Sequence, residues 1–231
     1  MEYKFSFNKE DCWYKQVCPS YNKTNCNENC VKYGYLHYLA EHALLSYAQQ
    51  HPPKLKSNII DDKIYQTLNN IKNNIVDFVK EGKNLLLDSN NTGNGKTTWA
   101  TKLIMQYLAT FGYCESPKAL FINVPKFCMM KKDMIAGYTH PDLHYILSQV
   151  ENVDLVVWDD LVATEMSSYD YLTLYVYINS RIDKHKSNIY TANYTGENVK
   201  KTIGDRLYSR VMNASTELTF KSPDLRVTKA K

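Results

Sequence analysis

The chain lacks the features that would place it in a membrane or outside the cell. Its 231 residues contain no apolar run of about 18, the length that a membrane-spanning helix needs. The first residues, 1–11, are too polar for a secretory signal, and internal repeats and low-complexity tracts are absent. We therefore expect a protein of the cytoplasm, with no membrane partner. Its length suits one domain of ordinary size plus a small appendage.

Arginine is also scarce, and the net charge is small. The formal charge of +4 is too low to indicate a nucleic-acid partner by itself. Only four of the 28 cationic residues are arginines, and all lie in the last quarter of the chain: Arg181, Arg206, Arg210 and Arg226. Because a guanidinium group can bind phosphate through two hydrogen bonds, this clustering favours a phosphate-sensing role. Ordinary helix-surface positions remain the alternative.

A phosphate-binding motif is the most informative stretch present. It reads NNTGNGKT, which fits the pattern G-x-x-x-x-G-K-[ST] with asparagine in place of the first glycine. The two glycines would let backbone N–H groups approach a β-phosphate, the lysine would reach the β- and γ-phosphates, and the threonine would ligate Mg²⁺. Asparagine tolerates left-handed backbone angles, so the turn can survive the replacement. The expected nucleotide-binding residues are Asn90, Asn91, Thr92, Gly93, Asn94, Gly95, Lys96, Thr97 and Thr98.

Apolar runs alternate with helical patterns around this motif. Strands are predicted at 84–87, 119–124, 154–160, 188–193 and 216–220. Helices are predicted between them, at 97–107, 125–136, 141–149, 167–185 and 197–212. This order predicts an α/β fold with a five-stranded parallel sheet that binds its ligand at the carboxyl ends of the strands. The last run alternates as an edge strand does.

Two acids end the third predicted strand, as in a Walker B motif. Asp159 would hold the hydration shell of Mg²⁺, and Asp160 would orient or deprotonate the attacking water. Because adjacent strand residues point to opposite faces, Asp160 must lie just past the regular strand for both to reach one site. The alternative, a solvated strand end, is disfavoured by the phosphate-binding motif about sixty residues earlier.

Four of the six cysteines fall within nineteen residues near the amino terminus. In a cytoplasmic chain such clustering favours a metal over disulfides, and four thiolates can enclose one Zn²⁺. The spacing is not that of a familiar zinc finger; His37 or His42 could replace one thiol, and idle thiols are the alternative. Cys114 and Cys128 are predicted as isolated core residues. The expected zinc ligands are Cys12, Cys18, Cys26 and Cys30.

A helical pattern at 31–50 follows the cysteines and ends at a His-Pro-Pro sequence. We expect three segments: a cysteine-rich, zinc-stapled helical module at 1–53, a linker at 54–67 and an ATPase domain at 68–231.

These motifs together resemble the AAA+ helicase loaders of the DnaC/DnaI type, and most closely the phage-encoded versions from low-GC Gram-positive hosts. The likeness rests on the phosphate-binding motif, TAN at 191–193, RLYSR at 206–210 and KSPDLR at 221–226, and it spans about 68–231 in motif order. The cysteine-rich start resembles the zinc-binding, helicase-contacting end of the DnaI branch. The resemblance implies an ATP-hydrolysing AAA+ core without a carboxyl-terminal helical lid, with ATP or ADP, Mg²⁺ and Zn²⁺ as cofactors.

The resemblance also implies roles for polar residues of the last third. Asn193 would be the sensor 1 residue near the γ-phosphate, with a strand-end cap as its ordinary alternative. Arg210 would be the arginine finger presented to a neighbouring subunit, assisted by Arg206, and such a finger can raise phosphoryl-transfer rates by roughly 10³ to 10⁵. Arg226 resembles the sensor 2 arginine, and Arg181 is a candidate for a second contact between subunits.

A helix at 125–137 lies where related AAA+ proteins carry a helix facing the central pore. It would contact single-stranded DNA through phosphates and base stacking. A solvated lysine face is the alternative. The expected DNA-binding residues are Lys126, Phe127, Lys131 and Lys132.

The leading hypothesis is an ATP-dependent loader that places a hexameric replicative helicase on single-stranded DNA during replication initiation, acting as an ATP-dependent homo-oligomer. Asn90, and Asp160 where many AAA+ ATPases carry glutamate, predict slow hydrolysis. One alternative is an IstB-like transposition ATPase, against which the cysteine module argues. Another is a helicase-binding adaptor or inhibitor that binds ATP without turnover. A small-molecule P-loop kinase is least expected, since arginines occupy the finger and sensor 2 positions.

Overall fold

A five-stranded parallel sheet forms the centre of the computed structural model, which describes residues 7–55, 59–111, 118–162 and 166–225. The strand order is β2-β3-β4-β1-β5, and every neighbouring pair is parallel. The strands are β1 (Asn84–Asp88), β2 (Ala119–Asn123), β3 (Leu155–Asp159), β4 (Ser187–Ala192) and β5 (Ser215–Thr219). The predicted sheet, with its last strand at an edge, is therefore confirmed.

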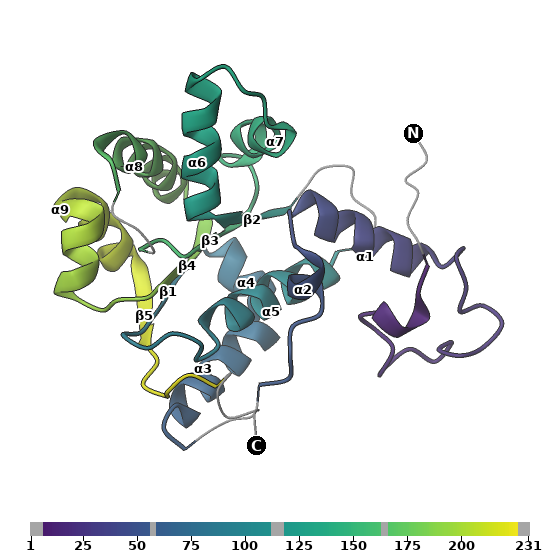
Figure 1. Cartoon of the computed structure of the whole chain (residues 1–231). Coiled ribbons are helices and arrows are strands. Elements are labelled where there is room, and N and C mark those ends of the chain that lie inside the picture. Colours follow the sequence, from purple (N-terminus) through teal and green to yellow (C-terminus); the bar gives the residue numbers. More distant parts are fainter. Residues whose placement is uncertain (1–6, 56–58, 112–117, 163–165, 226–231) are drawn as a thin grey trace.

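Helices cover both faces of this sheet, which makes three layers (Figure 1). A short 3₁₀ turn, η1 (Lys9–Asp11), precedes them in the cysteine-rich segment. The helices are α1 (Val31–His42), α2 (Tyr47–Gln50), α3 (Asp62–Asn73), α4 (Ile75–Lys80), α5 (Lys96–Ala109), α6 (Val124–Ile135), α7 (Pro141–Gln149), α8 (Ser168–Asp183) and α9 (Glu197–Ala214). In the described part of the chain, no helix has the length and apolar content needed to cross a membrane.

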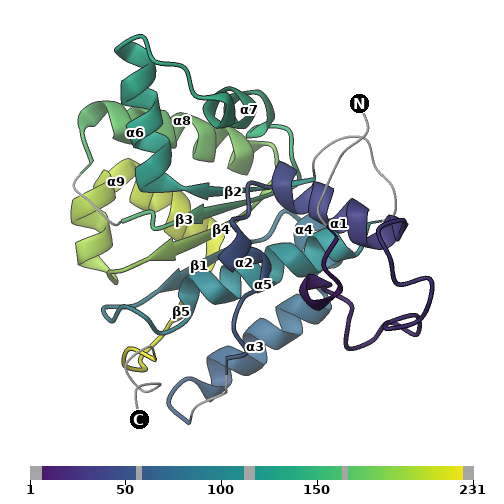
Figure 2. The same cartoon turned by 45° about the vertical axis from the view of Figure 1, so that its right-hand side comes forward.

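Alternating strand residues divide the apolar side chains into two cores. Leu85 and Leu87 of β1 face a core shared with α1, α3, α4 and α5. Leu86 faces the opposite way, into a core shared with α6, α7, α8 and α9. Figure 2 shows these two sets of helices on the two sides of the sheet. Since both faces are covered, the carboxyl edge of the strands is left to the loops.

The predicted single helix over 31–50 is wrong. Helix α1 ends at His42, because Leu44 takes a left-handed conformation (φ 63°) and the Leu45 N–H turns back to the Ala40 carbonyl at 2.9 Å. Helix α2 then starts afresh after a capping box formed by Ser46. The break has a tertiary use: the Ala43 carbonyl accepts the Phe121 N–H at 2.7 Å and so covers the free edge of β2.

Two other helices differ from expectation. Helix α3 begins at Asp62, so a helix occupies part of the segment expected to be a linker. Helix α9 is not continuous, because Gly204 has non-helical angles (φ 74°, ψ 156°) and lies against the Tyr171 ring. The segment boundaries themselves stay a prediction.

Candidate functional site

The phosphate-binding motif forms a loop between β1 and α5 at the carboxyl edge of the sheet. Its turn depends on Gly93 (φ 69°) and Gly95 (φ 99°), which adopt the left-handed angles that side chains disfavour. Asn90 has no positive φ, so the replaced glycine position does not need a left-handed residue. Instead, the Asn90 side-chain oxygen accepts a hydrogen bond from Thr195 at 3.2 Å.

The loop holds its lysine through its own polar atoms. Lys96 is only 5% exposed, and its Nζ donates to the Asn91 carbonyl at 3.0 Å and to Asn94 Oδ1 at 3.1 Å. Asn94 is fixed in turn by a 2.7 Å bond from its Nδ2 to Ser89 Oγ. The ammonium therefore lies directly at the start of α5, where free N–H groups and the helix dipole favour an anion.

Asp159 is the last residue of β3, which is separated from β1 by β4, and its side chain reaches the start of α5. Its Oδ1 accepts hydrogen bonds from Thr97 Oγ1 at 2.9 Å and from Thr191 Oγ1 at 2.8 Å. Burial and then the nearby carboxylate of Asp160 raise the pKa of Asp159 above its ordinary value. A divalent cation beside Asp159 and Thr97 would relieve that cost, so these oxygen donors fit Mg²⁺.

Asp160 lies one residue past β3, and it reaches the same site because its backbone is left-handed (φ 56°). Its N–H donates to Thr191 Oγ1 at 2.9 Å, and its Oδ1 accepts a bond from Asn193 Nδ2 at 3.1 Å. One hydroxyl, that of Thr191, thus bonds both the Asp159 carboxylate and the Asp160 backbone. The sequence analysis assigned no separate role to Thr191, although its place on β4, two residues before Asn193, was a usable signal.

The arginines separate into two kinds. Arg206 and Arg210 are exposed on α9, and Arg210 makes a 3.9 Å ion pair with Asp183 in which both side chains are about half exposed. Arg226 lies outside the described residues. The predicted contact of Arg181 with another subunit is wrong, because the side chain is fully buried. Its guanidinium donates to the carbonyls of Val150 (2.7 Å) and Ser187 (2.6 Å), among others, so it joins the end of α7 to the start of β4 inside the protein.

The predicted DNA-binding helix is α6, and one of its four residues is wrong. Phe127 has no exposed surface and packs in the core, so its ring is not available for stacking. The three lysines stay predictions, although each has a neighbour. Lys126 pairs with Asp142 at 3.3 Å, Lys132 pairs with Asp170 at 2.8 Å, and Lys131 lies over the Tyr169 ring.

The four amino-terminal cysteines do not form a ligand set as placed. Within the described ranges, no group of three or more His, Cys, Asp or Glu side chains is arranged to hold a metal ion. Burial raises the pKa of the Cys12 thiol, with smaller raising effects from the charges of the other three cysteines and a lowering effect from a backbone hydrogen bond. His42 Nδ1 lies 2.8 Å from the Tyr38 carbonyl, within its own helix. Cys114 lies outside the described residues, and Cys128 is partly buried on α6.

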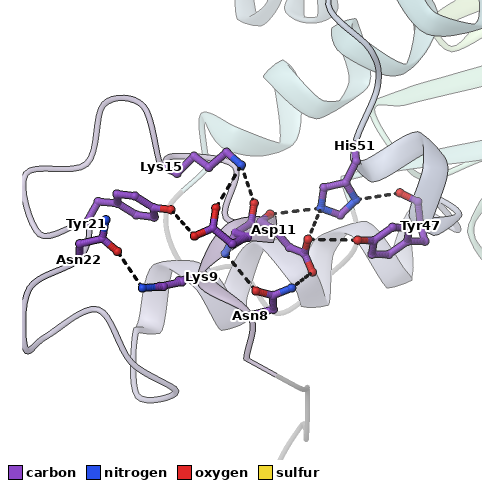
Figure 3. Close-up of polar contacts among 9 residues, drawn as sticks. Asn8, Lys9, Asp11, Lys15, Tyr21, Asn22, Tyr47 and His51 are labelled. Carbon is purple, nitrogen blue, oxygen red and sulfur yellow. Dashed lines mark hydrogen bonds and ion pairs between the residues drawn. The ribbon is translucent and has the colours of Figure 1, made fainter.

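A polar network organises the cysteine-rich segment instead (Figure 3). Its centre is the Asp11 carboxylate, which accepts hydrogen bonds from Asn8 Nδ2 at 2.9 Å and from the Tyr47 hydroxyl at 3.1 Å. The His51 ring lies 3.7 Å from the same carboxylate. Since Tyr47 and His51 belong to the α2 region, these contacts attach the segment to the rest of the molecule.

No protein-family model matches the chain, and no curated protein matches it. Among solved structures, the chain is similar to the crystal structure of the DnaC helicase loader, with a TM-score of 0.58 and 21% identity over 73% of this chain and 94% of that one. The chain has the AAA+ P-loop ATPase fold. This confirms the expected fold class for the sheet and its loop, but not the expected zinc-stapled module.

Two other solved structures share the fold. A putative primosome component from Streptococcus pyogenes serotype M3 has a TM-score of 0.59 and 18% identity over 80% of this chain and 96% of that one. AMPPCP-bound DnaA from Aquifex aeolicus has a TM-score of 0.56 and 15% identity over 72% of this chain and 48% of that one. The expected likeness to DnaC-type AAA+ proteins therefore holds at the level of the fold.

Proposed function

We propose that the protein is an ATP-dependent loader of a hexameric replicative DNA helicase onto single-stranded DNA during replication initiation. The observation that carries the proposal is the convergence of five side chains at one edge of the sheet. They are Lys96, Thr97, Asp159, Asp160 and Asn193. The fold likeness supports the proposal, because the proteins that share it include the DnaC helicase loader and the replication initiator DnaA.

The site suits a nucleoside triphosphate through its own residues. Lys96 would exchange its two loop acceptors for phosphate oxygens, while the loop N–H groups surround the β-phosphate. Thr97 and Asp159 would hold Mg²⁺, which when bound neutralises charge on the phosphates. Asp160, fixed by its bond from Asn193, would orient the attacking water.

We propose that hydrolysis is slow and that nucleotide acts mainly as an assembly switch. Aspartate at position 160 is one methylene shorter than glutamate, and the 3.1 Å bond from Asn193 restrains it. Arg210, and Arg206 one turn earlier, are exposed on α9, as a group acting on a neighbouring subunit must be. A homo-oligomer that forms with ATP is therefore part of the proposal.

We further propose that the module at 1–53 contacts the helicase and binds one structural Zn²⁺. Support comes from burial: between residues 7 and 30, no described residue is buried. Only a few of its side chains, such as Trp13 and Tyr14, pack against the core of the molecule, so the segment needs another source of stability, and its four cysteines offer one. The thiols would have to move to surround an ion. The direct test is the zinc content of the purified protein, measured by plasma mass spectrometry. One zinc per chain is expected.

The decisive experiment is size-exclusion chromatography with light scattering on the protein mixed with the replicative helicase of its host, with and without ATP. A stable complex is expected for the wild type, with ATP-dependent higher assembly that Lys96→Ala abolishes. Lys102→Ala, on the same helix but away from the loop, serves as the charge-matched control. No complex in any condition would overturn the loader and move the choice to a transposition-type ATPase.

Turnover separates the loader from the adaptor. With helicase and single-stranded DNA both present, a loader hydrolyses ATP, however slowly. Tight ATP binding with no phosphate release under these conditions would favour the adaptor. Charge reversal of Lys126 and Lys131 tests the DNA contact, since a role for α6 predicts weaker binding of single-stranded DNA.

A further inference from the structure

A buried carboxylate outside the candidate site joins two distant parts of the chain. Asp61, which precedes α3, is only 1% exposed. Its Oδ1 accepts the backbone N–H of Lys221 at 2.9 Å, and its Oδ2 accepts that of Ser222 at 3.1 Å, about 160 residues away in sequence. A carboxylate suits this task because both of its oxygens only accept hydrogen bonds.

The segment that Asp61 holds, residues 220–225, lies along the phosphate-binding loop, and we call it the carboxyl-terminal strap. In Figure 1 it runs from the end of β5 towards the start of α3. Asn91 Nδ2 donates to the carbonyls of Lys221 (3.4 Å) and Ser222 (3.1 Å), the two residues whose N–H groups Asp61 accepts. The strap is thus bonded on its N–H side by Asp61 and on its carbonyl side by the loop.

The strap contacts the loop at two more places. Ser89 Oγ donates to the Phe220 carbonyl at 2.8 Å, and the Leu225 N–H donates to the Gly93 carbonyl at 3.0 Å. The Asp224 carboxyl lies so close to Gly93 that a methyl group at this position would collide with it. The loop is therefore shaped by the strap as well as by its own glycines.

These bonds connect Asp61 to the reactive end of the loop. Asn91 bonds the strap with its side chain, and its carbonyl accepts the 3.0 Å bond from Lys96 Nζ. A continuous chain of hydrogen bonds thus runs from Asp61 through the strap and Asn91 to the lysine ammonium.

We propose that Asp61 is a positioning residue for the phosphate-binding loop, acting through the strap to hold Asn91 and Lys96 in the geometry that receives a triphosphate. This rests on the proposed function only in that the loop binds nucleotide. The direction in which nucleotide affinity changes when Asp61 is replaced distinguishes positioning from a simple effect of charge. Removing a negative charge near an anion site should tighten nucleotide binding, whereas loss of positioning weakens it.

The test measures binding of a fluorescent ATP analogue with Mg²⁺ to the full chain. Asp61→Asn keeps the shape but points an amide N–H₂ at a backbone donor, and we expect roughly tenfold weaker binding. Asp62→Asn removes the same charge one residue later without touching the strap, and it should bind as the wild type does. Because Asp61 acts through Asn91, the double variant Asp61→Asn with Asn91→Ala should be no weaker than its weaker single variant.

A second pair of variants leaves Asp61 intact, in case Asp61→Asn does not fold. Lys221→Pro deletes the N–H that Asp61 accepts, and Lys221→Ala retains it at this exposed position. Only the proline variant should lose affinity. Hydrogen exchange without nucleotide provides a second readout: Asp61→Asn or Lys221→Pro should speed exchange in the strap and also in residues 89–95.

The outcomes separate the two proposals. If the wild type binds no nucleotide, the proposed function fails, and hydrogen exchange still decides whether the strap shapes the loop. If the wild type binds nucleotide and Asp61→Asn or Lys221→Pro binds it equally well, the positioning role of Asp61 is overturned while the proposed function stands. Additive losses in the double variant, or faster exchange in the strap but not in the loop, would overturn it too.

Discussion

The candidate site at the sheet edge and the cysteine-rich segment are built in opposite ways. At the sheet edge, Asp159 and Lys96 are about 95% buried, and the bond from Thr97 to Asp159 joins residues 62 apart in sequence. In the segment from residue 7 to residue 30 no described residue is buried, and many bonds are local, such as that from Asn8 to Asp11, although the Tyr14 hydroxyl reaches the Ala109 carbonyl at 3.2 Å. Long-range packing therefore holds the groups at the sheet edge, whereas the segment is joined to the rest of the molecule by a few partly exposed contacts.

Burial also gives the sheet edge an electrostatic cost. Asp88, at the end of β1, has no exposed surface, and burial followed by the neighbouring Glu217 raises its pKa to about 7, against lowering effects that include the charge of Lys96. Asp159 is raised for a similar reason. Both carboxyl groups at this edge are therefore harder to ionise in the folded chain than in water.

Metal removal should have the largest effect and should touch only one of the two regions. If four thiols hold Zn²⁺, a chelator or Cys26→Ser should abolish hydrogen-exchange protection in residues 7–30, because binding of structural zinc contributes about 10 kcal/mol or more. The amides of the sheet should keep their protection. Cys128→Ser is the control, since it lies on α6. Unchanged protection after chelation would contradict the zinc proposal.

Loss of the loop lysine should have the next largest effect, and it should change ATP affinity at the sheet edge without changing the cysteine-rich segment. Lys96→Ala removes a buried ammonium that would bind two phosphates, so ATP affinity should fall roughly 100-fold, about 3 kcal/mol. Isothermal titration calorimetry measures this directly. Lys102→Ala should bind normally, and protection of the cysteine-rich segment should not change in either variant. Equal affinity of Lys96→Ala and the wild type would disprove nucleotide binding by this loop.

The cost of ionising the buried Asp88 carboxyl group should make the free energy of unfolding depend on pH. Because its folded pKa lies above the ordinary value, the group favours folding below about pH 4, and this contribution is lost as pH rises through about 7. Asp88→Asn should therefore exceed the wild type in unfolding free energy at pH 8, on the order of 2 kcal/mol, with the difference shrinking towards pH 5. Urea denaturation at both pH values measures it.

A matched control separates this effect from general charge removal. Asp77 is exposed on α4, so Asp77→Asn should give no such pH dependence. A stability difference for Asp88→Asn that is flat between pH 5 and pH 8 would show that its ionisation is not the cause.

The smallest effect concerns the attachment of the cysteine-rich segment. Tyr47→Phe removes the bond to Asp11, and the segment should become slightly more sensitive to limited proteolysis. Tyr21→Phe, which loses only a bond to Glu10 within the segment, is the comparison. A larger effect from Tyr21 than from Tyr47 would contradict the view that contacts with the α2 region hold the segment in place.

Most of the sheet could be predicted from the sequence, because buried parallel strands are short apolar runs and the helices between them repeat at three and four residues. The helix over 31–50 was the main failure. Its apolar pattern continues past His42, but the left-handed Leu44 breaks it so that Ala43 can bond the edge of β2. That bond depends on a strand 78 residues further on, which no local pattern contains.

The site divides in the same way. The residues that would touch phosphate or Mg²⁺ follow a fixed spacing, so Lys96, Thr97 and Asp159 were identifiable by type and position. Phe127 and Arg181 were misassigned because residue type alone does not tell a surface residue from a buried one, and both are fully buried.

By itself, the sequence determined that a phosphate-binding loop follows the first strand of an α/β sheet and that two acids end another strand. Only the tertiary structure decided that Thr191 bonds the Asp159 carboxylate and the Asp160 backbone, and that Asp61 bonds the carboxyl-terminal strap beside the loop. The physical reason is that loop chemistry needs residue types at short spacing, whereas support comes from groups that meet only after the sheet has brought distant segments together.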